Sequence, residues 1–520
     1  MSKIDELFGE RIKENALDSD YIDKVETENE VEIKKIDKFL TVVLLLLILI
    51  IPLVVRVHFS DFVSPQVTGT DLDSGSKSDI FTFYKFVLLL IGTMILGLVF
   101  LYKVIFVGYV IPKSKINILT GILAVTILLS AIFAPNKTLA LIGMYNRHEG
   151  TLTYLCYIAL FFIASNIKYT AKQLSLFIYI LYPFVIINTT LGLLNFFGID
   201  ILKYEFGRAI LFSGLPEGSN LQEGSKFLAT INHGNYVSGF AAVLIGLFLT
   251  MSLLDNNKVR SLINLFFALA SFAMLLGSLS SSGFVTLLVI LPIMALLVIK
   301  AKGKRYFATI FVLFFIVGSG IFTIMAKYNP QVWNESIGVI LKNNPFENVQ
   351  SAIGKVLESD KVYANEKVDY NFPNLPESGV GPGSGRLYIW GKTWELIKER
   401  PLFGYGLDTM PFHFPQNDTG KHENIETYRV IVDKPHNIYV GVAYGSGLLA
   451  FVFLLSFITM QLIAVAKKLV LKASLVGYSL FIGIIAFLVQ FLFNDSLLGT
   501  TFIFWVLFGL FNDISKLNQT

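Results

Sequence analysis

The residues from Ser261 to Ile299 form an apolar run without a single charged side chain. As one α-helix this run would be about 58 Å long at about 1.5 Å per residue, roughly twice the ~30 Å hydrocarbon layer of a membrane. The run must therefore turn back on itself. The stretch from Gly277 to Gly283, rich in Gly and Ser, is its only polar and flexible break, and it predicts a hairpin of two membrane-spanning helices with its tip there.

Further apolar runs, each of a length suited to one membrane crossing, occur before and after this one. The composition agrees, because 54% of the 520 residues are hydrophobic and 15% are charged, against about 25% charged in soluble domains. This excludes an ordinary soluble enzyme, and a net charge of +4 gives no reason to expect a nucleic-acid partner. We predict an all-α polytopic membrane protein with about twelve transmembrane helices. The expected crossings are residues 39–55, 83–107, 116–134, 151–167, 173–196, 228–254, 261–280, 283–299, 306–326, 437–466, 474–493 and 496–511.

The distribution of Lys and Arg between the loops predicts the orientation of the chain. If the N-terminus lies inside, the charged residues of the short inner loops are all basic except Asp255. We therefore expect both termini in the cytoplasm. The predicted order is a cytoplasmic tail, nine helices, a large extracytoplasmic loop between helices 9 and 10, three helices and a cytoplasmic end, at residues 1–38, 39–326, 327–436, 437–511 and 512–520.

Histidine and arginine gather on the predicted outer side, although the orientation bias favours arginine inside. Arginine binds phosphate through two parallel hydrogen bonds, so outward arginines at a membrane surface suggest an anionic ligand such as a lipid-linked phosphate. Ordinary solvation of the loops is the alternative explanation. The outer residues are His58, His148, His233, His413, His422 and His436, with Arg56, Arg147, Arg208, Arg386, Arg400 and Arg429.

A glycine-rich segment, Gly379 to Gly385, runs directly into a helical pattern that Pro401 ends. Glycines at the start of a helix leave backbone N–H groups free at its positive end. Arg386 in the first turn would add a guanidinium group, and together these donors suit a diphosphate. An amphipathic helix on the membrane surface, with its tryptophans among the headgroups, is an alternative that is compatible with the first. The predicted apolar face is Leu387, Trp390, Trp394 and Ile397.

His436 stands immediately before the tenth predicted crossing. A histidine at the membrane surface can take a proton from a hydroxyl group, as glycosyl transfer to a sugar alcohol requires. By itself, a histidine at such a position is more often a helix-terminus or core residue. Asp71 and Asp73 have the D-x-D spacing of metal-dependent glycosyltransferases, but they lie among Gly, Ser and Thr, where a turn also explains them.

Charged residues are nearly absent from the predicted crossings. Lys85 and Lys103 lie near helix ends, where their ammonium groups can extend to the membrane surface. A proton- or ion-coupled carrier usually needs charges near the middle of the membrane. The sequence therefore argues against a coupled transporter.

The stretch from Gly383 to Gly447 resembles the signature region of the O-antigen ligase and Wzy-type polymerase superfamily. It reads GSGRLYIWGKTWELIKERPLFGYGLDTM and then DKPHNIYVGVAYGSGLL, against a family pattern of Arg and Trp before a PLFGYG turn and a later HN-aromatic step. The stretch from Thr230 to Gly239 is similar to the family's TFGNPNYLAG. The segment GMYNRHEGTLTYL, which contains Arg147, resembles an outer loop of Gram-positive members.

This resemblance implies a metal-independent membrane glycosyltransferase of the GT-C type on the outer face of the cytoplasmic membrane. Its donor would be an undecaprenyl-diphosphate-linked glycan, its acceptor a glycan or another envelope component, and it would need no cofactor. His436 matches the family's catalytic histidine, and Arg386 matches the arginine that binds the diphosphate leaving group. The further substrate-binding residues expected are Asn235, Tyr236, Trp390 and Asn437.

The chain departs from the family pattern at the predicted hairpin tip. Family members often have a second arginine in an SRG step there, where this chain has Ser281, Ser282 and Gly283. Arg147 and Arg208 are the candidates to replace it. The expected function is polymerisation or ligation of cell-envelope polysaccharide, and the alternative is a polysaccharide exporter or a lipid-linked oligosaccharide flippase, which would need a charged central cavity and would not need His436.

Overall fold

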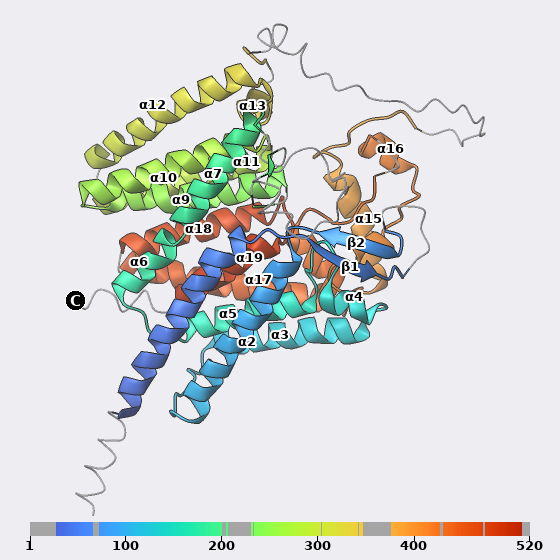
Figure 1. Ribbon diagram of the computed structural model, residues 1–520, viewed down its shortest axis with the longest axis horizontal. Coiled ribbons are helices and arrows are strands. Elements are labelled where there is room, and N and C mark those ends of the chain that lie inside the picture. The colour runs from blue at the N-terminus through green and yellow to red at the C-terminus, as the bar shows by residue number, and fades with distance from the viewer. Residues whose placement is uncertain are drawn as a thin grey trace, which may run out of the picture.

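The computed structural model describes residues 28–65, 72–199, 204–205, 230–231, 233–302, 304–341, 343–346, 376–426, 430–471 and 474–511. Within these ranges, 9 helices are long and apolar enough to cross a membrane. This confirms a polytopic membrane protein (Figure 1). The long helices are Glu28–Leu53, α2 (Phe83–Ile105), α3 (Lys115–Phe133), α6 and α7 together (Ala171–Tyr179, Tyr182–Phe196), α9 (Gly234–Leu254), α10 (Lys258–Gly277), α11 (Ser281–Lys302), α12 (Lys304–Tyr328) and α17 (Ile438–Leu471).

Three further apolar helices are shorter than a typical crossing. They coincide with the remaining predicted runs, and the count of twelve crossings stays a prediction. These helices are α5 (Thr151–Ser165), α18 (Leu475–Gln490) and α19 (Leu498–Leu510).

The uncharged run from Ser261 to Ile299 is divided as predicted, because α10 ends at Gly277 and α11 begins at Ser281. Both helices pack against α9, as does α18, and α9 is buried along its whole length. Gly283 lets α11 approach α9 closely, since a Cβ atom there would collide with the Ser238 backbone. The hairpin tip is thereby fixed against the start of α9.

Lys103 and Lys85 are buried, so the prediction that their ammonium groups reach the membrane surface is wrong. Lys103 Nζ lies 2.6 Å from Asp37 Oδ1 and donates to the Asn166 carbonyl at 3.0 Å. Lys85 Nζ donates to the Thr230 carbonyl at 2.7 Å. Protein groups solvate both ions, because neighbouring helices cover these helix ends before the side chains can reach water.

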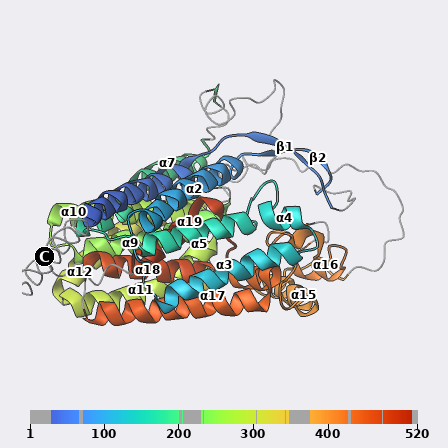
Figure 2. The ribbon, with the colours of Figure 1, turned by 90° about the horizontal axis from the view of Figure 1, so that it is seen from below.

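The helices run side by side, and the segments predicted to face outward gather at one end of them (Figure 2). Two antiparallel strands, β1 (His58–Phe62) and β2 (Gly75–Asp79), pair there from His58 with Asp79 to Phe62 with Gly75. The short helices are α4 (Lys137–Ile142), α13 (Gln331–Asn334), α15 (Arg386–Glu399) and α16 (Gly420–Asn424), with 3-10 turns η1 (Ile51–Leu53), η3 (Ile337–Val339) and η6 (Met410–Phe412).

Helix α15 begins at Arg386, directly after Gly385 in the left-handed conformation (φ 78°). Of the predicted apolar face, Ile397 is buried, whereas Leu387 and Trp394 are 56% and 51% exposed, so that face does not coincide with the one packed on the protein, and its place at the membrane surface stays a prediction. The buried face contains Ile389, Thr393 and Ile397. A threonine is tolerated there because its hydroxyl donates to the Ile389 carbonyl at 2.7 Å, which satisfies the polar group inside the helix.

The PLFGYG turn docks onto a break in α17. Gly447 has φ 81° and ψ 169° inside that helix, and a Cβ atom there would collide with the Leu402 carbonyl. The backbone groups freed by the break pair with the turn, because Leu448 N donates to the Pro401 carbonyl (2.7 Å) and Tyr405 N donates to that of Tyr444 (3.1 Å). The break thus ties the large loop to the first turns of α17, where the candidate site lies.

Candidate active site

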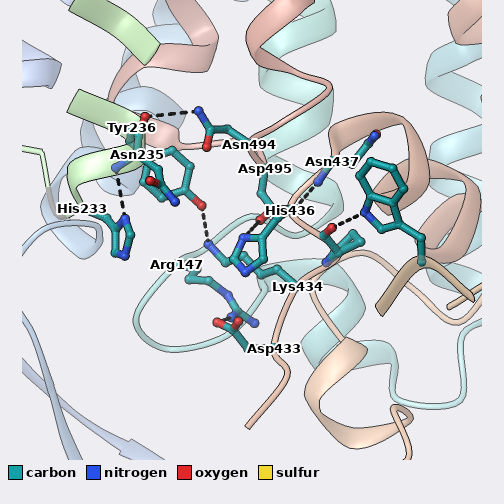
Figure 3. Close-up of polar contacts among 12 residues, drawn as sticks. Arg147, His233, Asn235, Tyr236, Asp433, Lys434, His436, Asn437, Asn494 and Asp495 are labelled. Carbon is teal, nitrogen blue, oxygen red and sulfur yellow. Dashed lines mark hydrogen bonds and ion pairs between the residues drawn. The ribbon is translucent and has the colours of Figure 1, made fainter. Parts of the chain in front are cut away.

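His436 lies at the entrance to α17 with its side chain 39% exposed. Its Nδ1 lies 3.0 Å from Oδ2 of Asp495, in the short connection between α18 and α19 (Figure 3). A carboxylate at Nδ1 fixes the orientation of the imidazole and stabilises its protonated form, which leaves Nε2 to accept a proton. The pair therefore has the arrangement of a general base beside an acid at ion-pair distance, and Oδ2 of Asp495 makes no hydrogen bond within the described residues.

The backbone at His436 is held in the left-handed region, with φ 52°. This conformation is uncommon for a residue with a side chain and persists only where neighbouring contacts impose it. Trp390 Nε1 donates to the Pro435 carbonyl at 2.7 Å, and Asn437 N donates to Asp495 Oδ1 at 3.2 Å. These contacts on both sides of His436 hold its side chain toward Asp495.

Asn437 caps α17 instead of presenting a free amide. Its Oδ1 accepts from Tyr439 N (2.9 Å) and Val440 N (3.1 Å), and its Nδ2 donates to the Leu492 carbonyl (3.2 Å). Trp390 is likewise engaged through its indole N–H. Both side chains, predicted as substrate-binding, are placed to position His436.

Lys434 and Tyr236 contact each other beside His436. Lys434 Nζ donates to the Tyr236 hydroxyl at 3.2 Å and lies 5.4 Å from the centre of the Tyr236 ring. Figure 3 shows this contact next to the His436–Asp495 pair. The lysine therefore places a positive charge at the site, and Tyr236, which the sequence singled out, holds it.

Arg147 is buried and paired with two carboxylates. Its Nε lies 2.6 Å from Asp408 Oδ1, and its Nη1 contacts Asp433. Nη2 is buried without a hydrogen-bond partner among the described residues. Because Asp433 stands three positions before His436, this ion-pair cluster anchors the histidine segment to the loop before α5.

Arg386 is half-buried, and no hydrogen bond or ion pair ties its guanidinium to another of the described residues. Burial lowers the pKa of Arg386, whereas the nearby Asp495 carboxylate and Tyr236 raise it. Arginine nevertheless stays charged over the physiological range. An unpaired cation close to Asp495 and Tyr236 is free to bind an anion.

Asn235 joins the site to the hairpin formed by α10 and α11. Its Oδ1 accepts from the Ser280 hydroxyl at 2.6 Å, and its carbonyl accepts from Ser282 Oγ and Asn494 Nδ2, each at 3.2 Å. The hairpin tip that lacks the second arginine is therefore joined to the connection that carries Asp495. Arg208 and Asp71 lie outside the described residues.

Three charged residues of the site, Asp495, Lys434 and Glu149, were not among the predicted site residues. Asp495 does carry a sequence signal, since it is an isolated charge between two apolar runs, and Lys434 belongs to the Asp433–Lys434 pair just before the tenth predicted crossing. A small cavity of about 60 Å³ lies behind the histidine segment, and these three residues line it together with Asp408 and Asp433. Within the described ranges, no group of three or more His, Cys, Asp or Glu side chains has the arrangement of a metal site.

The fold and the site define a polytopic membrane protein with a His–Asp pair and an arginine, Arg386, that has no ion-pair partner among the described residues. Residues 265–455 match the family model described as O-antigen ligase, a range that includes Arg386 and His436. The match confirms the resemblance to the O-antigen ligase and polymerase superfamily and supports a membrane enzyme of cell-envelope polysaccharide assembly, with a lipid-linked glycan and an acceptor as its general substrates. No curated protein matches the chain.

Proposed function

We propose that this protein is a metal-independent glycosyltransferase that transfers or polymerises an undecaprenyl-diphosphate-linked glycan on the outer face of the cytoplasmic membrane. The His436–Asp495 pair carries this proposal, because it combines an accessible imidazole with an acid at the opposite ring nitrogen. Nε2 of His436 takes the proton of the acceptor hydroxyl as that oxygen attacks the anomeric carbon, and the bond from this carbon to the diphosphate oxygen breaks.

Arg386 binds the diphosphate in this mechanism. The leaving group gains negative charge as the glycosidic bond breaks, and a fixed cation that is already partly desolvated stabilises that charge without reorganisation. The guanidinium of Arg386, which has no partner among the described residues, supplies two parallel donors for such a group. Lys434, held by Tyr236, adds a second positive charge.

The family resemblance and the cations of the site support metal independence, since Arg386 and Lys434 together offer the charge that a divalent ion would otherwise provide. Full activity in the presence of a chelator is the expected result. Loss of activity in chelator that added magnesium or manganese restores would contradict this part of the proposal.

An exporter or flippase is the alternative function. The buried charges of the described membrane-length helices are Lys103 with Asp37 and Lys85, near the ends of their helices, and the cavity lined by charges lies at the start of α17. These positions do not form the charged centre that a coupled carrier uses. They therefore favour the enzyme.

The proposal is tested by the size distribution of envelope polysaccharide in a deletion strain that carries wild type, His436→Ala or Arg386→Ala. We expect both variants to reach the membrane in normal amount and to abolish product. His58→Ala and Arg56→Ala are the matched controls, because His58 stacks on Phe83 and Arg56 lies over the Tyr84 ring, and neither contacts His436; both should restore normal polysaccharide.

The products that accumulate in the His436→Ala strain separate the possible functions. Single lipid-linked repeat units on the outer face identify a polymerase, and long lipid-linked chains that do not reach their acceptor identify a ligase. Lipid-linked units that stay on the inner face indicate a flippase. Normal polysaccharide in the His436→Ala strain contradicts the catalytic assignment.

A further inference from the structure

Glu149 is a buried acid in the loop that leads into α5, only 7% exposed. The Ser496 hydroxyl donates to its Oε2 at 2.5 Å, and the Tyr157 hydroxyl donates to its Oε1 at 3.0 Å. The mechanism proposed above does not use this residue. A carboxyl group so deeply buried, with both oxygens engaged, needs a reason to be there.

Glu149 is connected to the His436–Asp495 pair through Ser496. Ser496, which bonds to Glu149, directly follows Asp495, so this contact fixes the connection that carries the aspartate. Glu149 N also lies 3.4 Å from Asp408 Oδ2, the carboxylate that Arg147 pairs with. Glu149 therefore links the two polar clusters that hold the His436 segment from opposite sides.

The charges around Glu149 favour its neutral form. Burial raises the pKa of Glu149 to about 8, and the Asp408 carboxylate raises it further, while the hydrogen bonds from Ser496 and Tyr157 and the ammonium of Lys434 lower it. Asp433 and Asp495 line the same cavity. A further negative charge in this cavity would oppose the binding of an anionic diphosphate nearby.

We propose that Glu149 is a positioning residue for glycosyl transfer, which acts in its protonated form and holds Asp495, and through it His436, by way of Ser496. This inference rests on the proposed function. As long as Glu149 is neutral, its own O–H donates to one of the two hydroxyl oxygens while its other oxygen accepts from the second, so it supports the pair without adding charge to the site. Its ionisation at higher pH places a carboxylate behind Asp495 and Lys434 and weakens the positive potential that the diphosphate requires.

The test compares Glu149→Gln with Glu149→Ala in membrane vesicles from the deletion strain, supplied with lipid-linked glycan extracted from that strain. Glutamine has the shape of the neutral acid and keeps partners for Ser496 and Tyr157. We expect Glu149→Ala to lower the rate about tenfold or more, which corresponds to about 1.4 kcal/mol. Glu149→Gln should stay within about threefold of wild type at pH 7 and should keep its rate above pH 8, where that of wild type falls.

Glu399→Gln is the matched control, because Glu399 also accepts a tyrosine hydrogen bond, from Tyr405 at 2.5 Å, but lies at the far end of α15. It should leave the wild-type pH profile in place. Ser496→Ala removes the link and keeps the acid, and it should lower the rate even if Glu149→Ala fails to fold.

Thermal unfolding in detergent gives a second measurement that does not depend on turnover. Folding raises the pKa of Glu149 from about 4.5 to about 8. The stability that the neutral acid contributes is therefore fully present below pH 4.5 and is lost as the pH rises through about 8. The unfolding temperature of wild type should therefore fall more between pH 6 and pH 9 than that of Glu149→Gln. Identical pH dependence of rate and of unfolding in the two proteins would overturn the inference.

The two proposals fail in distinguishable ways. If His436→Ala is inactive but both Glu149→Ala and Ser496→Ala keep the wild-type rate and pH profile, only the role of Glu149 is wrong. If His436→Ala retains wild-type activity, the proposed function itself is wrong.

Discussion

The Asp495 carboxylate lies 3.0 Å from Nδ1 of His436, which leaves Nε2 as the ring nitrogen that can receive a proton. Asp495→Asn replaces the carboxylate by an amide that cannot stabilise the imidazolium formed during transfer. Because a positioned general base contributes about 10²–10⁴-fold, we expect a loss of rate of about 10²-fold. The rate of polysaccharide formation in membrane vesicles measures this, at equal amounts of protein.

Asp61→Asn is the control for that comparison, since Asp61 is an exposed aspartate on β1 at the same end of the protein. It should leave the rate unchanged. An Asp495→Asn variant with wild-type rate would show that the aspartate does not assist His436.

Trp390→Phe removes the hydrogen bond to the Pro435 carbonyl but keeps an aromatic ring in place. A neutral hydrogen bond contributes about 0.5–1.5 kcal/mol, so the rate should fall by roughly 3- to 10-fold as the His436 segment loosens. Trp394→Phe on the same helix is the control, because Trp394 is 51% exposed. Equal rates in the two variants would argue against a positioning role for Trp390.

Arg147→Ala distinguishes a structural arginine from a ligand-binding one. It leaves Asp408 buried without its cation, and breaking such a pair from one side costs about 3–5 kcal/mol. We expect a large drop in the unfolding temperature of the purified protein and in its amount in the membrane. Arg147→Lys should recover only part of this, since a point charge cannot contact both carboxylates in the same geometry.

If Arg147 instead serves the diphosphate alone, Arg147→Ala keeps the wild-type unfolding temperature and loses only activity. The unpaired Nη2 is the atom through which such a contact would be made. Comparison of unfolding temperature with rate therefore decides between the two roles.

The buried pair of Lys103 and Asp37 should act on stability without taking part in the reaction. Lys103→Met alone leaves Asp37 as an unpaired buried charge and should destabilise the protein by about 3–5 kcal/mol. The double variant Lys103→Met, Asp37→Leu should recover most of this loss, because two apolar groups replace the pair. Thermal unfolding in detergent measures both, and failure of the second substitution to rescue the first would contradict the pairing.

Several features followed from local sequence patterns. The break between Gly277 and Ser281 is the one polar interruption in a run too long to cross the membrane once, so the hairpin had to form there. The start of α15 at Arg386 follows from the glycines before it. His436 stands at the start of α17 because the charged loop ends where the apolar run begins.

The buried face of α15 could not be predicted in the same way. Leu387 and Trp394 are as apolar as Ile389 and Ile397, but the helix turns the second pair toward α17 and the loop. In a protein that also contacts lipid, an apolar side chain does not reveal whether its neighbour is lipid or protein. Thr393 belongs to the buried face despite its hydroxyl, because its own helix satisfies it.

The sequence by itself determined the membrane class and the two residues, Arg386 and His436, of the stretch that resembles the family's signature region. Only the tertiary structure decided that Asp495 lies beside the histidine, that Arg147 is enclosed by two aspartates and that Glu149 accepts hydrogen bonds from Ser496 and Tyr157. Local patterns encode where a helix begins and ends, because caps, glycines and apolar runs act over a few residues. Ion pairs and hydrogen bonds between distant segments depend on how the helices pack, and that packing brings the loop before α5, the start of α17 and the α18–α19 connection to one place.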